Sequence, residues 1–134
     1  MTSSFVFEDT EQGKRLFDGS EEGNVYSRYS NPSVSEFEHK MAQLEGGEAA
    51  LATASGMSAI FSALSTLLSA GDHVLSSRSI FGSTHQILSQ ILPRWGVDFA
   101  YVDYHKTEEW EAAIIPGKTK VLFFPVWKIL EPGP

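Results

Sequence analysis

Short apolar runs alternate with longer segments of helical spacing between residues 33 and 124. Apolar residues that recur three and four positions apart predict helices over residues 33–45, 57–68, 84–95 and 107–115. Short apolar runs predict strands over residues 49–54, 73–76, 97–102 and 120–124. Strands that alternate with helices are typical of βαβ units, in which helices cover both faces of a parallel sheet. The pattern therefore predicts an α/β fold with a mostly parallel, four-stranded sheet.

Local signals mark the ends of the predicted helices. Ser33 has the residue type of a helix cap, and Glu36 three residues later completes a capping box. Gly46 and Gly47 are expected to end this first helix. In the last predicted helix, Thr107 is expected to cap the first turn.

Residues 1–32 lack this periodicity and are rich in glycine, serine, asparagine and acidic residues. Such a composition favours an extended arm over a packed element, although residues 4–7 have the pattern of a short strand. Residues 33–124 form the predicted α/β domain. Residues 125–134 follow a strand but do not continue the alternating pattern, so they are interpreted as an aberrant tail. The predicted sheet is incomplete at this end.

The composition excludes several classes of protein. The chain has 134 residues, of which 42% are apolar and 20% charged, and its formal net charge is −7. This negative charge repels phosphate backbones, so nucleic acid is not expected as a partner. The absence of cysteine excludes a disulfide framework and a cysteine nucleophile, and the four histidines lack metal-ligand spacing, so no metal site is expected. No run approaches the roughly 18 apolar residues of a membrane span and no apolar leader opens the chain, so a cytoplasmic protein without membrane contact is expected.

The turn before the second predicted helix, at Ser55, Gly56 and Met57, is a candidate anion site. Backbone N–H groups at a helix start carry partial positive charge, and a glycine lets an anion approach closely. The segment matches neither the glycine-rich dinucleotide fingerprint nor the phosphate loop that requires Gly-Lys-Ser/Thr. From these residues alone, a phosphate site and a tight turn that needs glycine both remain open.

Two further segments carry residues suited to a phosphorylated aromatic ligand. Tyr26 and Arg28 alternate in a segment expected to be extended, so their side chains are predicted to project to the same side. A guanidinium can donate two parallel hydrogen bonds to a phosphate. Phe81 follows the strand at 73–76, at the sheet edge where ligands of open α/β sheets collect, and can stack on a flat ring. The alternatives are a surface arm with an incidental charge and an ordinary core phenylalanine.

Four motifs, taken together, resemble those of one enzyme family. They are Tyr26-Ser27-Arg28-Tyr29-Ser30-Asn31-Pro32, Leu44-Glu45-Gly46-Gly47-Glu48-Ala49-Ala50, Ala54-Ser55-Gly56-Met57-Ser58-Ala59-Ile60 and Gly71-Asp72-His73-Val74. In order and spacing they resemble the Cys/Met-metabolism family of pyridoxal-phosphate enzymes, which includes γ-synthases, γ-lyases and homoserine sulfhydrylases. The resemblance extends over residues 3–124. Within the family, residues 77–84, with Phe81 where many relatives have tyrosine, resemble the sulfhydrylases that use O-succinylhomoserine.

The resemblance implies a cofactor, pyridoxal 5′-phosphate, and a role for five residues. Gly56 and Met57 match the backbone donors to the cofactor phosphate, and Phe81 matches the aromatic residue that stacks on the pyridine ring. Tyr26 and Arg28 match the pair that reaches across a dimer interface to the neighbouring subunit's phosphate. The resemblance therefore implies a homo-oligomer formed through the N-terminal arm, since family members are usually tetramers with the fold of type I aminotransferases.

The implied reaction replaces the succinyloxy group at the γ-carbon of O-succinylhomoserine with sulfide and gives homocysteine in methionine biosynthesis. O-acylhomoserine and sulfide are then the expected substrates. An O-acetylhomoserine sulfhydrylase, a cystathionine γ-synthase and a methionine γ-lyase remain alternatives within the family. A stand-alone nucleotide-binding α/β domain is an alternative outside it, disfavoured because both nucleotide motifs are missing.

Part of the family's pattern has no counterpart in this sequence. The segments with the ring aspartate, the Schiff-base lysine and the substrate-carboxylate arginine come later in the family, and none of the six lysines here lies in that lysine's motif. After Phe124 the family continues with Glu-Thr-x-Ser-Asn-Pro, where this sequence has Pro125-Val126-Trp127-Lys128. We therefore expect a truncated copy with no catalytic residue of its own and no activity in isolation. A non-catalytic remnant is the corresponding alternative function.

Overall fold

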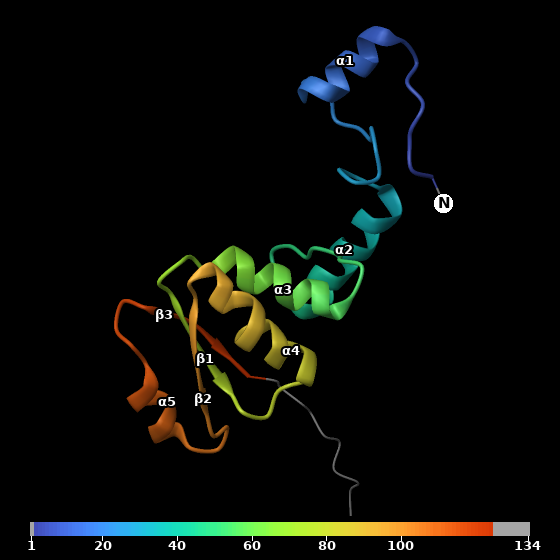
Figure 1. The fold of residues 1–134 in the computed structure, drawn as a ribbon. Coiled ribbons are helices and arrows are strands. Elements are labelled where there is room, and N and C mark those ends of the chain that lie inside the picture. The colour runs from blue at the N-terminus through green and yellow to red at the C-terminus, as the bar shows by residue number, and fades with distance from the viewer. Residues whose placement is uncertain (1, 125–134) are drawn as a thin grey trace, which may run out of the picture. The chain divides into compact units, whose positions relative to one another are not determined.

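The computed structural model describes residues 2–124 (Figure 1). Contacts divide the chain into two compact units, the first ending at Ala52 and the second beginning at Thr53. The elements, in chain order, are α1 (Thr10–Asp18) and α2 (Pro32–Glu45) in the first unit, then α3 (Gly56–Leu67), β1 (His73–Ser77), α4 (Gly82–Gln86), β2 (Asp98–Val102), α5 (Thr107–Ala113) and β3 (Thr119–Phe123) in the second. The aberrant tail predicted over residues 125–134 lies outside the described residues. Within the described part, no helix is long and apolar enough to cross a membrane.

The N-terminal segment contains a helix, α1, so the prediction of an arm without packed elements is wrong. The carboxylate of Asp9 accepts a hydrogen bond from the Gln12 amide at 2.7 Å and caps the helix. Gly19 ends the helix in the left-handed conformation, with a φ of 78°. The short strand expected over residues 4–7 is reduced to one antiparallel bridge, between Ser4 and Tyr26.

Helix α2 begins at Pro32, and its cap is Asn31 instead of the expected Ser33. Asn31 has an extended backbone, and its side chain accepts a hydrogen bond from the Ser33 amide at 3.0 Å. Proline suits the first helical position because its missing N–H has no intrahelical acceptor there. Glu36 forms an ion pair with Lys40 at 3.0 Å and makes no capping box. The expected stop is confirmed, since Gly46 closes the helix with a φ of 66°.

No strand forms over residues 49–54, and this prediction is wrong. The described part of the chain offers the segment no ladder partner. One of its amides is satisfied by a side chain, because the Ala52 N–H donates to the Glu38 carboxylate at 2.7 Å. A run of small apolar residues becomes a strand only when another strand pairs with it. The described sheet therefore has three strands, one fewer than expected.

The second unit is built around a parallel sheet of order β2-β1-β3. All five residues of the central strand β1 are buried. Helix α3 contributes Leu64 to the core, and the helical segment over residues 82–95 contributes Leu88 and Leu92, all three packing around Val74. Two ladders and a covered face explain the burial of β1 and confirm the predicted parallel α/β architecture.

The helix expected over residues 84–95 changes its winding along its length. α4 begins at Gly82, a wide π turn follows over Ile87–Ile91, and a 3₁₀ turn over Leu92–Trp95 completes the segment. Pro93 lacks the N–H that a regular helix needs, which explains why the α pattern does not continue through it. At α5, the helix begins at Thr107 as expected, but Lys106 occupies the cap position and no side chain bonds there.

Candidate functional site

A hollow of about 500 Å³ lies at the start of α3 in the second unit. It is bordered by the first turn of α3, the loop between β1 and α4, and the end of β3. The lining residues are Ser55, Gly56, Met57, Ile60, Ile80, Phe81, Thr84 and Phe123. The hollow therefore brings together four residues singled out in the sequence, namely Ser55, Gly56, Met57 and Phe81.

Two backbone amides in the first turn of α3 form no hydrogen bond within the described part of the chain. The Ser55 hydroxyl accepts from the Ser58 amide at 3.1 Å, and the Ser55 carbonyl accepts from the Ala59 amide at 3.1 Å. The amides of Gly56 and Met57 have no partner among residues 2–124. The first N–H groups of a helix lack intrahelical acceptors and carry its partial positive charge. This helix start is therefore equipped to receive an anion.

Gly56 leaves space that the chain itself does not use. Its φ lies outside the positive range, and a Cβ placed on it would find no other atom within 4 Å. Neither a special backbone conformation nor internal packing requires glycine at this position. The alternative of a tight turn that needs glycine is therefore not what the geometry shows. The open space leaves room for an external group, such as a phosphate, to approach the backbone closely.

Phe81 presents an aromatic ring beside this helix start. It has an extended backbone at the cap position of α4, and 66% of its surface is exposed. The alternative of an ordinary core phenylalanine is therefore excluded in the described structure. An exposed ring on the wall of a hollow can stack on a flat ligand.

Thr84 is a lining residue that the sequence reasoning missed. It is 1% exposed and borders the hollow one helical turn after Phe81. Residues three positions apart on a helix share a face, and this spacing would have been the signal. Ile60, Ile80 and Phe123 were also missed as lining residues, because apolar residues at such positions look like ordinary core.

The hollow contains no charged side chain among its lining residues. The partial positive charge that borders the hollow is therefore that of the start of α3, whose first turn has no acidic residue. Shifted pKa values occur elsewhere: the Arg15 guanidinium holds the pKa of Glu21 below its ordinary value, and burial raises the pKa of Tyr101. Over residues 2–124, no group of three potential metal-ligating side chains comes together.

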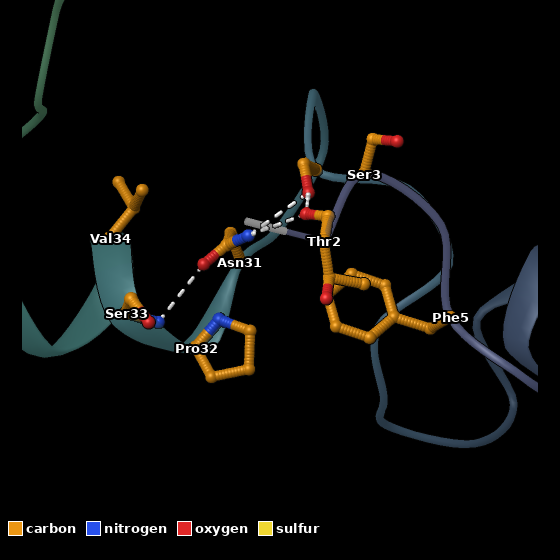
Figure 2. A pocket seen from close by; sticks show the side chains of 8 residues that line it. Thr2, Ser3, Phe5, Asn31, Pro32, Ser33 and Val34 are labelled. Atoms are coloured by element: carbon orange, nitrogen blue, oxygen red, sulfur yellow. Dashed lines mark hydrogen bonds between the residues drawn. The ribbon is translucent and has the colours of Figure 1, made fainter.

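Tyr26 and Arg28 lie in the first unit and are close to each other. The Arg28 guanidinium carbon lies 5.9 Å from the centre of the Tyr26 ring, within the range of a cation–π interaction. Their backbone is not extended as expected, because the Tyr29 amide donates to the Tyr26 carbonyl at 2.8 Å and closes a turn. The two side chains are nevertheless adjacent, as predicted. The same turn borders a second hollow, lined by residues of both the N-terminal segment and the start of α2 (Figure 2).

The fold and this geometry define an α/β unit with a helix start open to an anion beside an exposed aromatic ring. The family model "Cys/Met metabolism PLP-dependent enzyme" matches residues 1–126, and the chain belongs to this family. The family resemblance inferred from the motifs is thereby confirmed, and with it the dependence of the family on pyridoxal 5′-phosphate.

Curated relatives from three bacteria illustrate the match. O-succinylhomoserine sulfhydrylases from Mycobacterium tuberculosis and Pseudomonas aeruginosa are 45% and 48% identical to the chain, over 92% and 91% of its length. An L-methionine γ-lyase from Porphyromonas gingivalis is 45% identical over 91% of the chain. The chain spans 30% of the length of each of these three proteins.

Solved structures show the same fold. An O-acetylhomoserine (thiol)-lyase structure from Campylobacter jejuni, which contains N′-pyridoxyl-lysine-5′-monophosphate, matches with a TM-score of 0.78 and 36% identity. A cystathionine γ-lyase from Lactobacillus plantarum, complexed with L-serine, matches with a TM-score of 0.77 and 34% identity. Each match covers 92% of the chain and 30% of the other protein. The predicted fold class, a partial α/β domain of this enzyme type, is confirmed.

Proposed function

We propose that this chain binds the phosphate and the ring of pyridoxal 5′-phosphate at the hollow beside α3. The observation that carries the proposal is the open cradle at Gly56, next to two amides without partners in the described residues. The amides of Gly56 and Met57 would hold the phosphate, and Phe81 would lie against the ring. Such positioning aligns the cofactor before any reaction begins.

Tyr26 and Arg28 are proposed to contact the phosphate held by a second copy of the chain. Both residues are exposed, and Arg28 forms no ion pair within residues 2–124. The first unit also exposes large apolar side chains, with Phe17 71%, Tyr29 77% and Leu44 79% exposed. Apolar surface of this kind is typical of a surface covered by a partner. We therefore expect sedimentation to show self-association that Phe17→Ser and Leu44→Ser weaken; a stable monodisperse monomer would contradict the oligomer.

The proposed reaction is that of an O-succinylhomoserine sulfhydrylase: sulfide displaces succinate from the γ-carbon of the substrate to give homocysteine. Two of the curated relatives with this name are 45% and 48% identical to the chain, which supports this choice. The bound cofactor supplies an electron-withdrawing ring that makes bonds at the amino-acid carbon labile. The residues of this chain bind and orient that ring, while acid–base catalysis requires groups that do not line the described hollow.

Methionine γ-lyase and O-acetylhomoserine sulfhydrylase activities are the second candidates. Relatives with the first activity are as similar as the sulfhydrylases, at 45% identity for the P. gingivalis enzyme. The C. jejuni structure is the observation that favours the second. Comparing homocysteine formation from the succinyl and acetyl substrates with methionine cleavage, in an enzyme that contains this chain, distinguishes the three.

Binding of pyridoxine 5′-phosphate tests the site without catalysis, because this analogue lacks the aldehyde that reacts with lysines. We expect calorimetry to show binding of pyridoxine 5′-phosphate at least tenfold tighter than that of pyridoxine. Gly56→Ala should remove this preference, since its methyl group would occupy the phosphate's approach, without lowering the melting temperature.

Gly47→Ala is the matched control for the phosphate site. Gly47 lies outside the hollow, has no positive φ, and offers a new Cβ only ordinary contacts, at 3.6 Å and beyond. We expect this variant to bind both ligands as the wild type does. Equal wild-type affinity for pyridoxine and its phosphate would overturn the proposed function, and so would an unchanged preference in Gly56→Ala.

A further inference from the structure

Asn31 connects the start of α2 to the turn that carries Tyr26 and Arg28. Its side-chain carbonyl accepts a hydrogen bond from the Ser33 amide at 3.0 Å. Its side-chain amide donates to the Ser27 hydroxyl at 2.9 Å and to the Thr2 carbonyl at 3.4 Å. Figure 2 shows the Asn31 side chain between the backbone of Ser33 and that of Thr2. One asparagine therefore serves as a helix cap and as a link to a separate segment.

Ser27 is the residue between Tyr26 and Arg28, and three hydrogen bonds fix it. Its hydroxyl donates to the Thr2 carbonyl at 2.6 Å and accepts from Asn31. Its backbone amide donates to the Ser3 carbonyl at 2.9 Å. The turn closed by Tyr29 and Tyr26 is thus fastened at its centre. These hydrogen bonds restrict the backbone at Ser27, and with it the directions in which the side chains of Tyr26 and Arg28 project.

Arg28 lies on this turn and forms no ion pair within residues 2–124. Arg28 is exposed, and its guanidinium carbon lies 5.9 Å from the centre of the Tyr26 ring. A long side chain loses roughly 1.5–2 kcal/mol of rotamer freedom when it is immobilised. If the backbone of the turn already directs the Arg28 side chain toward the ligand, fewer side-chain conformations are lost on binding.

We propose that Asn31 is a positioning residue for phosphate recognition, holding the turn so that Tyr26 and Arg28 face the same anion. This inference rests on the proposed function, in which these two residues contact the cofactor phosphate. Asn31 acts through the turn and does not touch the phosphate. Its two hydrogen-bonding groups have separate tasks: the carbonyl caps α2, and the amide holds Ser27.

Asn31→Ser separates these tasks. Serine is a good helix cap and is uncharged, but its side chain is too short to replace the amide at Ser27. Ser27→Ala removes the same link from the other end. Ser33→Ala is the matched control, because Ser33 borders the same hollow and contributes its backbone amide, which the substitution keeps.

We expect Asn31→Ser and Ser27→Ala each to weaken binding of pyridoxine 5′-phosphate about three- to tenfold, the range of one lost hydrogen bond. Binding of pyridoxine, which has no phosphate, should stay unchanged. The double variant should lose no more than either single variant, because both remove one link. Arg28→Ala should lose at least as much, and Ser33→Ala should bind like the wild type.

NMR of the Arg28 side chain gives a readout that does not depend on the cofactor. We expect the Arg28 Nε–H to become more mobile in Asn31→Ser while the α2 signals keep their positions. The proposal is overturned if this mobility is unchanged, or if Asn31→Ser retains the phosphate preference that Arg28→Ala loses. A loss of both ligands together with helix signals would also overturn it, by showing a merely structural role. If the wild type shows no phosphate preference, the proposed function fails and this inference fails with it.

Discussion

The imidazole Nδ1 of His73 lies 2.9 Å from the hydroxyl oxygen of Thr119, joining the first residues of β1 and β3. The Thr119 oxygen also accepts a hydrogen bond from the Ile115 amide at 2.8 Å. His73 is 3% exposed, so water cannot readily replace this partner. The pair therefore fastens the strand whose last residue, Phe123, borders the hollow.

Replacing Thr119 with valine should destabilise the second unit. The substitution leaves the buried His73 nitrogen and the Ile115 amide without their partner, which costs about 1–3 kcal/mol in the free energy of unfolding. Urea denaturation measures this change. Thr66→Val is the matched control: the Thr66 hydroxyl bonds to the Ser62 carbonyl at an exposed site, so about 0.5 kcal/mol or less is expected. Equal effects of the two substitutions would contradict the buried role.

Phe81→Ala should weaken binding of pyridoxine and of pyridoxine 5′-phosphate by the same factor. Ring stacking contributes about 0.5–1.5 kcal/mol beyond burial and does not involve the phosphate. Because Phe81 is 66% exposed, the melting temperature should change little. Calorimetric titration with both ligands checks the prediction, and Phe81→Tyr should retain binding. A selective loss of the phosphorylated ligand would place Phe81 elsewhere in the site.

Borohydride treatment in the presence of pyridoxal 5′-phosphate should label no single lysine stoichiometrically. None of the residues lining the described hollow is a lysine.

The isolated 134-residue chain should likewise form no homocysteine from O-succinylhomoserine and sulfide above the rate of the free cofactor, since binding contacts alone do not provide a proton-transferring group. Peptide mapping and a thiol assay measure the two outcomes. A stoichiometric adduct on one lysine, or saturable turnover, would contradict the prediction.

Acidification should release the end of α1 from the loop after it. The Arg15 side chain, 2.8 Å from Glu21, holds the pKa of that carboxyl below its ordinary value, and Gln12 adds a further hydrogen bond. A lowered folded pKa stabilises the structure above the unfolded value, and this contribution disappears as the pH falls through the folded value. NMR titration of the Glu21 carboxyl should therefore show a low midpoint that Arg15→Gln returns to the ordinary range. Identical midpoints in the two proteins would exclude the ion pair.

Elements with local signals were predictable from the sequence. Helix α3 follows from the helical spacing after the Ser55-Gly56 turn, and β1 from a strand-like run between turn residues; both form, and α3 begins one residue before the predicted range. The place of Phe81 follows from the parallel sheet, because Phe81 comes after β1 at the edge where β3 also ends, at Phe123; no strand precedes Gly56, so its presence in the same hollow was not predictable in this way.

The errors concern features that depend on distant partners or on less familiar caps. Residues 49–54 have the composition of a strand, but composition does not reveal whether another strand is present to pair with them. Helix α1 was missed because its cap, Asp9, stands in a polar segment that resembles an arm. Ser33 and Asn31 are both good caps, and Pro32 decides between them by fixing the first helical position.

The strand order β2-β1-β3 also has a consequence for synthesis on the ribosome. β1 is made first yet occupies the centre of the described sheet, so its two ladders can form only after β2 and β3 have been synthesised. Its second ladder requires Phe123 to have emerged, about fifty residues after the strand begins at His73. Throughout that interval one edge of β1 has no partner strand in the described sheet. Between the emergence of β1 and that of β3, the nascent chain therefore exposes an unpaired strand edge, which is open to non-native strand pairing.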